Sequence, residues 1–197
     1  FDSDDLSALK TGSMRVEVKE LAQKDVWQSR QFDGTTVTKD SKINMGNLTI
    51  NGTSIDTTNK SYSDLVTEIN KISGVQASLI ESSDGKFRLA IKSTETGTAN
   101  KINFNTKDIS GNDLGVSSGA AKLFGDGSAL SDSLNVLKAQ DMELKADGVN
   151  YSSSSNTVTI DGLKITATKK GGDSTINIEN DTTTLSDQMK NFADKFN

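Results

Sequence analysis

Two Asp-Gly turns, Asp147-Gly148 and Asp161-Gly162, most restrict what this chain can fold into. An Asp-Gly pair suits a two-residue hairpin turn, because both central positions need positive φ. The residues flanking each turn alternate between apolar and polar, so the apolar ones fall on one face. We therefore predict that the stretch from Ala139 to Asp181 is a β-sheet with one buried face. The predicted cross-strand pairs are Leu144 with Tyr151, Ala146 with Val149, Val158 with Ile165, and Ile160 with Leu163.

The composition is lean for a compact globule. Apolar residues make up 32% of the 197 residues and aromatic residues only 5%, which favours one or two domains built from small modules joined along a rod. A net charge of −5 argues against nucleic acid or an anionic membrane surface as partner, since both require clustered Lys and Arg. No apolar run approaches the length of a membrane span.

The residue types that the chain lacks exclude most enzyme chemistry. It contains no Cys, His or Pro. Disulfides and thiolate metal sites are therefore impossible, and the usual general base and commonest metal ligand are absent. We expect no enzyme activity, no catalytic or metal site and no cofactor.

Four features could be mistaken for sites. The acids Asp2, Asp4 and Asp5, and the set Asp126, Ser128 and Asp132, lack the spacing of a calcium loop, so we interpret them as solvated side chains. Gly171-Gly172 follows two lysines without the spacing of a phosphate loop, and we interpret it as a hairpin turn. Trp27, the single Trp, is predicted to anchor packing.

Residues 40–105 are predicted to form a compact α+β module with the order β-β-α-β-β-β. Its first hairpin turns at Asn51-Gly52 and sets Leu48 against Ile55. A helix follows, with Ser61 as N-cap and Asp64 at the capping-box position, and Gly74 ends it. The next hairpin has a three-residue loop at 83–85. The pairs that this loop predicts are Leu79 with Leu89 and Ala77 with Ile91, and a last strand is predicted at Ile102 and Phe104.

The first alternating strand, Met14 to Val18, is predicted to join the sheet at 139–181, because a small sheet needs a partner over its apolar face. The fold class is then α+β, mainly β: a split antiparallel β domain that carries an inserted small α+β domain, with helical stumps at both termini. The predicted division is 1–12 stump or linker, 13–39 and 134–181 split β domain, 40–105 inserted domain, 106–133 linker, and 182–197 the start of a terminal helix. The first residues do not resemble a natural N-terminus, and we expect the natural chain to continue past Asn197.

Four segments in order resemble the family of flagellar filament-capping proteins, also called hook-associated protein 2. VKELAQKDVWQS (18–29) is similar to the family's N-terminal segment. The stretch 61–93 resembles the flagellin and hook "IN" motif, with Ile69-Asn70 as its name pair. The Asp-Gly hairpins of 139–171 are similar to the start of the family's C-terminal half. NFADKFN (191–197) resembles its helix start, with Phe196 in place of Tyr.

The resemblance implies a structural role. Members form a ring, commonly described as a pentamer, at the distal tip of the bacterial flagellar filament, where exported flagellin is retained, folds and polymerises. The partners it implies are further copies of the chain, flagellin and, for an adhesive role, host surface glycans or mucin, with neither nucleic acid nor membrane. The implied location is extracellular, reached without a cleaved signal peptide. Many relatives carry a longer central region, which leaves the adhesive role open.

A second reading stays open. The chain could be another flagellar or appendage surface subunit, such as a hook-junction or flagellin-like protein, or an adhesin that contacts host surfaces. The two readings differ in assembly, because a cap closes into a ring whereas a filament subunit polymerises openly.

Overall fold

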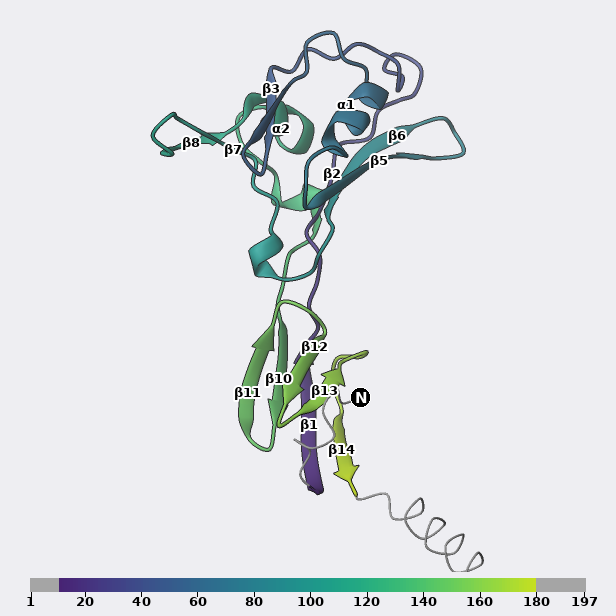
Figure 1. The fold of residues 1–197 in the computed structure, drawn as a ribbon. Coiled ribbons are helices and arrows are strands. Elements are labelled where there is room, and N and C mark those ends of the chain that lie inside the picture. The colour runs from purple at the N-terminus through teal and green to yellow at the C-terminus, as the bar shows by residue number, and fades with distance from the viewer. Residues whose placement is uncertain (1–10, 180–197) are drawn as a thin grey trace, which may run out of the picture. The chain divides into compact units, whose positions relative to one another are not determined.

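The structure is a computed structural model that describes residues 11–179 (Figure 1). The described residues form antiparallel sheets with two α-helices, which confirms the predicted α+β, mainly β fold class. Contacts divide the chain into two units. Unit 2 holds Ala22–Met142 and Ser153–Ser155, and unit 1 holds the segments on either side, including Glu143–Ser152. The helical segments predicted over the first ten residues and from 182 onward lie outside the described residues.

Unit 1 is built around strand β1, which lies between two strands that come much later in the chain. Val16 of β1 pairs with Ala146 of β10 on one side and with Ser174 of β14 on the other. Met14 and Val16 are buried while their neighbours are exposed, so the strand alternates as predicted and joins the later sheet. The strands of unit 1 are β1 (Gly12–Glu20), β10 (Met142–Ala146), β11 (Val149–Ser153), β12 (Thr157–Ile160), β13 (Leu163–Thr166) and β14 (Asp173–Ile178), with sheet order β11-β10-β1-β14.

The two Asp-Gly turns form as predicted, but their hairpins belong to different sheets. Asp147 and Asp161 have φ of 46° and 48°, and the glycine after each is also at positive φ, as the turn requires. Ile160 pairs with Leu163 and Val158 with Ile165. However, β12-β13 is a separate two-stranded sheet, so the prediction of one continuous sheet is corrected to two.

Gly171 and Gly172 do not make a hairpin turn. They lie in the connection from β13 to β14, which are strands of different sheets. The Gly171 N–H donates to the carbonyl of Val18 at 2.9 Å, and this contact anchors the connection on β1. The sequence shows the turn residues but not which strands they join.

Unit 2 contains the remaining elements. Its main sheet has the order β5-β6-β2-β9, and β3-β4 and β7-β8 are separate hairpins. The elements are β2 (Val26–Gln28), β3 (Asn47–Ile50), β4 (Thr53–Asp56), α1 (Tyr62–Ile69), β5 (Val75–Glu81), β6 (Phe87–Ser93), β7 (Asn105–Lys107), β8 (Asp113–Val116), α2 (Ser118–Phe124) and β9 (Asn135–Leu137), with short 3₁₀ turns at Thr98–Asn100 and Asp132–Leu134.

Local predictions for unit 2 are confirmed. Leu48 pairs with Ile55, Leu79 with Leu89 and Ala77 with Ile91. Ser61 caps α1, and Asp64 completes the capping box by accepting the Ser61 N–H at 2.9 Å. The helix ends earlier than predicted, at Ile69, because i→i+3 bonds replace helical bonds before Gly74.

Long-range pairing changes the predicted layout. Strands β2 and β9 fall in segments predicted for the split β domain, but they join the main sheet of unit 2: β2 pairs with β6, and β9 pairs with β2. Residues 106–133, predicted to be a linker, hold β8 and the short helix α2. Ile102 and Phe104 are buried as expected of a strand, but they precede β7 rather than form it. Strand β8 and helix α2 are too short for hydrophobic periodicity to reveal them.

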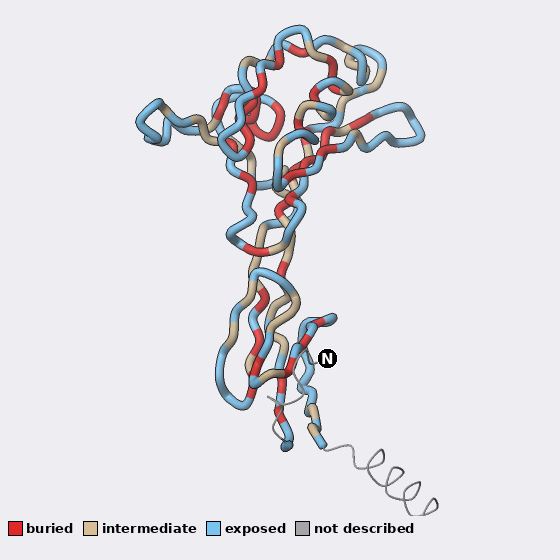
Figure 2. Tube along the Cα trace, in the orientation of Figure 1, coloured by how far each residue is buried: buried red, intermediate tan, exposed pale blue. Residues whose placement is uncertain are grey.

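The large hydrophobic core lies in unit 2. Leu65 of α1, Leu89 of β6 and Phe124 of α2 are all fully buried there, and Figure 2 marks the buried stretches of the chain in red. The two helices of the described chain are too short and too polar to cross a membrane.

We predict that Ala22–Met142 folds without the rest of the chain, because its whole hydrophobic cluster comes from within that range. The fragment should unfold in a single cooperative transition in urea, followed by the fluorescence of Trp27. Leu65→Ala in the fragment should lower the free energy of unfolding by about 2–5 kcal/mol, since it empties a fully buried site. Gradual, non-cooperative unfolding of the fragment would contradict the division into units.

Several turns of unit 2 are held by aspartate carboxylates. Asp33 accepts hydrogen bonds from the backbone N–H groups of Val37 (3.0 Å) and Thr35 (2.9 Å), which lower its pKa to about 2. Asp126 accepts from the N–H groups of Ala129 and Ser128, and these bonds also lower its pKa. A hydrogen bond to the charged form favours that form, so these turns are most stable when the carboxylates are ionised.

Stability should therefore fall in acid. The folded pKa of Asp33 lies below its unfolded value of about 3.9, so its stabilising contribution is complete above that pH and is lost as the pH falls toward about 2. Urea unfolding across this range should show a declining free energy of unfolding. Asp33→Asn keeps an acceptor oxygen but cannot titrate, and should make the decline shallower. Identical pH dependence in the two proteins would count against the role of this turn.

Candidate interaction surface

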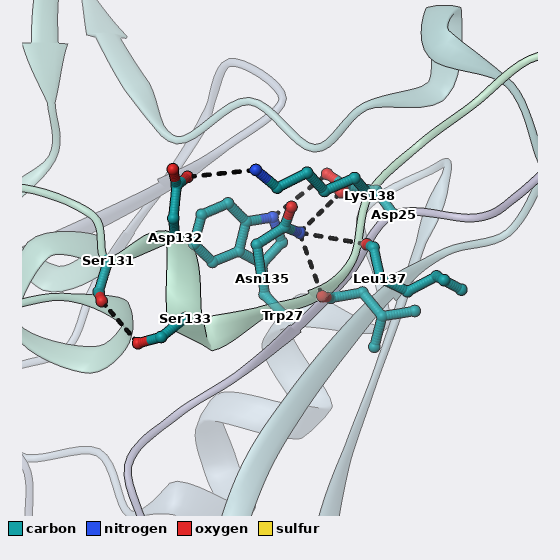
Figure 3. A network of polar contacts seen from close by, with 9 residues as sticks. Asp25, Trp27, Ser131, Asp132, Ser133, Asn135, Leu137 and Lys138 are labelled. Carbon is teal, nitrogen blue, oxygen red and sulfur yellow. Dashed lines mark hydrogen bonds and ion pairs between the residues drawn. The ribbon is translucent and has the colours of Figure 1, made fainter.

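A buried carboxylate lies at the centre of unit 2 beside a cavity. Asp25 is only 1% exposed. Its Oδ2 accepts from the Trp27 indole Nε1 at 3.2 Å and from the Ile102 backbone N–H at 2.8 Å, while its Oδ1 accepts from the Asn135 side-chain amide at 2.9 Å (Figure 3). Three donors thus compensate for removing the charge from water.

These bonds join segments that are far apart in sequence. The Asp25 N–H donates to the Ser93 hydroxyl at 3.0 Å, and the Ser93 N–H returns a bond to the Asp25 carbonyl at 2.8 Å. The Asn135 amide also donates to the carbonyls of Val26 and Leu137, at 3.2 Å each. One carboxylate and one amide therefore fasten β9 and the segment before β7 to β2.

Trp27 packs as predicted. It is 4% exposed, and its ring meets Phe104 edge-on at 5.4 Å and Phe124 at 6.2 Å between centroids. Phe104 and Phe124 stack at 5.2 Å. Aromatic pairs prefer such geometries, which fix ring positions more narrowly than aliphatic packing. The Asp25 bond to the indole fixes the remaining orientation of Trp27.

The cavity beside this network has a volume of about 540 Å³. Trp27, Ile102, Phe104 and Leu130 form its apolar part. Two exposed lysines belong to its lining: Lys138, which pairs with Asp132 at 3.7 Å, and Lys101. The volume falls within the usual range of ligand pockets, and the lining combines ring edges, amides and ammonium groups.

Of the two acidic sets named in the sequence, only the set Asp126, Ser128 and Asp132 lies within the described residues, and its two carboxylates have different partners. Asp126 holds its own turn, and Asp132 turns toward Lys138 instead of toward Asp126 or Ser128. Asp2, Asp4 and Asp5 lie outside the described residues. Within residues 11–179, no group of three or more acidic side chains is placed to hold a metal ion.

The sequence does not point to this cavity. Asp25 sits in an ordinary polar stretch, and its only local signal is an acid two residues before the single Trp. Its other partners, Ile102 and Asn135, are distant in sequence and are not otherwise conspicuous. The cavity next to the network has walls of mixed polarity.

We predict that Asp25→Ala lowers the free energy of unfolding by about 3 kcal/mol, because two buried donors and one half-buried donor lose their acceptor. Asp25→Asn should also destabilise, since its NH₂ would face a donor. The matched control is Asp132→Asn, whose side chain is 92% exposed and which should change stability by less than about 0.5 kcal/mol. Equal effects of Asp25→Ala and the control, measured by urea unfolding, would contradict this role.

Comparisons with known proteins agree with the fold and the sequence. The model of the family described as "Flagellar hook-associated protein 2 C-terminus" matches residues 139–197. Flagellar hook-associated protein 2 of Campylobacter jejuni is 30% identical over 223 residues, covering 97% of this chain and 35% of the relative. The protein of the same name from Salmonella typhimurium is 27% identical over 146 residues, covering 72% of this chain and 29% of the relative.

Solved structures extend the likeness. The flagellar cap protein FliD D1-D2-D3 domains from Escherichia coli match with a TM-score of 0.65 and 25% identity, over 95% of this chain and 54% of that chain. FliD (HAP2) from Pseudomonas aeruginosa PAO1 shares the fold with a TM-score of 0.68 and 24% identity, over 99% of this chain and 90% of that chain. The chain spans about a third of the length of the curated relatives it matches.

The matches to sequence and to structure thus reach the same family by separate routes, and they cover both the inserted unit and the C-terminal segment. This chain belongs to the flagellar hook-associated protein 2 family, the flagellar cap proteins.

Proposed function

We propose that this chain is the structural part of a cap at the distal end of the bacterial flagellar filament. In this role it assembles into a homo-oligomeric ring, retains exported flagellin and promotes flagellin folding and polymerisation at the tip. The observation that carries the proposal is the likeness over 97% of the chain to a flagellar hook-associated protein 2. The protein would act outside the cell, on the filament.

The described surfaces support a scaffold rather than an enzyme. The buried carboxylate Asp25 has its acceptor oxygens occupied by Trp27, Ile102 and Asn135 and serves packing. The cavity beside it is mixed in polarity, as protein-binding sites are. A cap needs such recognition surfaces without turnover.

The composition supports passage through a narrow export channel. A chain without Cys needs no oxidation to refold outside the cell. A lean apolar content of 32% limits the hydrophobic surface that the unfolded chain exposes. Hairpins closed by two-residue and three-residue turns form from local contacts, which favours rapid refolding.

Deletion of the gene for this chain tests the proposal. We expect cells without filaments that release unpolymerised flagellin into the medium, because subunits that reach the tip would no longer be retained. Electron microscopy of the cells and immunoblotting of the culture supernatant measure the two effects. Restoring the intact gene in trans should restore filaments.

The deletion also separates the cap from the alternative role. An adhesin or other appendage surface subunit would leave filaments of normal length and remove only binding to host glycans or mucin. Normal filaments in the deletion strain would therefore contradict the cap function, whatever happened to adhesion.

A further inference from the structure

The β7-β8 hairpin carries the most exposed large apolar residues of the described chain. Ile109 at its tip has an exposed fraction of 108%, and Leu114 on β8 has 64%. The hairpin forms a sheet of its own with only two strands, and Figure 1 shows it projecting from unit 2. Fully exposed side chains of this kind, on an arm with two open edges, are typical of a surface that a partner covers.

The tip of this arm is held in a defined shape. The Asp108 carboxylate accepts from the N–H groups of Ser110 and Asn112 and from the Asn112 side-chain amide, at 2.8 Å each. The backbone closes the loop with a bond from the Asp108 N–H to the Asn112 carbonyl at 3.0 Å. Ile109 is thus presented on a preformed loop, which lowers the entropy lost on binding.

The arm cannot be covered by its own unit. The exposed fraction of Ile109 means that no described residue packs on it. Asn105, which begins β7, already belongs to the lining of the cavity beside Asp25. Because the arm starts at the cavity and leads away from it, its tip is positioned for another molecule.

The same cavity has the properties that such a tip requires. Its apolar part can receive an aliphatic side chain, and its volume of about 540 Å³ leaves room for the loop around Ile109. The charges also match. The arm carries Asp108 and Asp113 against a single Lys107. Four charged residues line the cavity: Asp132 pairs with Lys138, and Asp25 accepts three hydrogen bonds, which leaves Lys101 without an ion pair among residues 11–179.

We propose that the β7-β8 arm of one copy of this chain docks in the cavity beside Asp25 of the next copy. Ile109 enters the apolar part, and Asp108 approaches Lys101. The arm and the cavity lie at different places on one chain, so the contact is head-to-tail. Such a contact generates a ring when the rotation that relates successive copies closes on itself. The inference rests on the proposed function for its partner, because it assumes that copies assemble; the contact itself is read from the arm and the cavity.

Residues 1–197 contain no Cys, so cysteines introduced there can mark the two sides of the contact in the intact protein, once any Cys elsewhere in that protein has been replaced by Ser. Ile109→Cys in one preparation and Lys138→Cys in a second are mixed and oxidised gently. Each variant alone places its thiols on only one side of the contact. We expect a cross-linked dimer from the mixture only. The matched control replaces Ile109→Cys by Ile80→Cys, an exposed isoleucine on β5, and should give no cross-link to Lys138→Cys.

A second measurement checks the energetics. Ile109→Asp should weaken self-association, measured by analytical ultracentrifugation, by roughly tenfold or more, as expected for an interface anchor. Its urea unfolding as a monomer should be unchanged, because Ile109 has no packing to lose. Ile80→Asp should leave self-association as it is.

The outcomes distinguish this inference from the proposed function. The inference is overturned if no mixed dimer forms or if Ile109→Asp assembles normally. The cap function would still stand in each case, provided the deletion strain lacks filaments and releases flagellin. Conversely, a mixed dimer together with normal filaments in the deletion strain would support the contact and reject the cap.

Discussion

The fold of unit 2 depends on one buried acidic side chain. Asp25 binds an indole, a backbone N–H and a side-chain amide from three separate segments, and its own backbone is tied to Ser93. An unpaired buried charge would be very costly, so these donors must arrive together. The position of β9, of the segment before β7 and of Trp27 all follow from that requirement. A purely apolar contact would fix their spacing less strictly, because it has no directional bonds.

Whether a feature could be predicted from the sequence depends on how far apart in the chain its contacting residues lie. The registers at Asn51-Gly52, at the three-residue loop before Lys86 and at Asp161-Gly162 were accessible, because turn chemistry and alternation must agree locally. The capping box of α1 was accessible for the same reason. The pairing of β1 with the late strands followed from the need to cover an apolar face. Each of these features is specified either by residues a few positions apart or by one apolar sheet face that needs a partner.

The features that escaped prediction depend on distant partners. Strands β2 and β9 have three residues each, too few to show a period, and only their bonds to β6 and to each other make them strands. Helix α2 forms where Gly119 allows close approach to β3: a Cβ at this position would lie 2.9 Å from the Asn47 carbonyl oxygen. The cavity shares this origin, since its walls meet only after Asp25, Ile102 and Asn135 are brought together. Its existence could not be inferred from composition or spacing.

The order of folding follows from the same long-range contacts. Strand β1 must find β10 and β14, which lie beyond the whole of unit 2 in the sequence. Closing a flexible loop of on the order of 100 residues costs roughly 4 kcal/mol. Once unit 2 has folded, Gln23 and Gln140 are bonded to each other across its base, at 2.8 and 3.3 Å. The last residue of β1 and the first residue of β10 then lie only a few residues from the Gln23–Gln140 contact. This contact has therefore closed the large loop before their sheet forms. Formation of unit 2 before unit 1 therefore lowers the loop-closure cost of the split sheet.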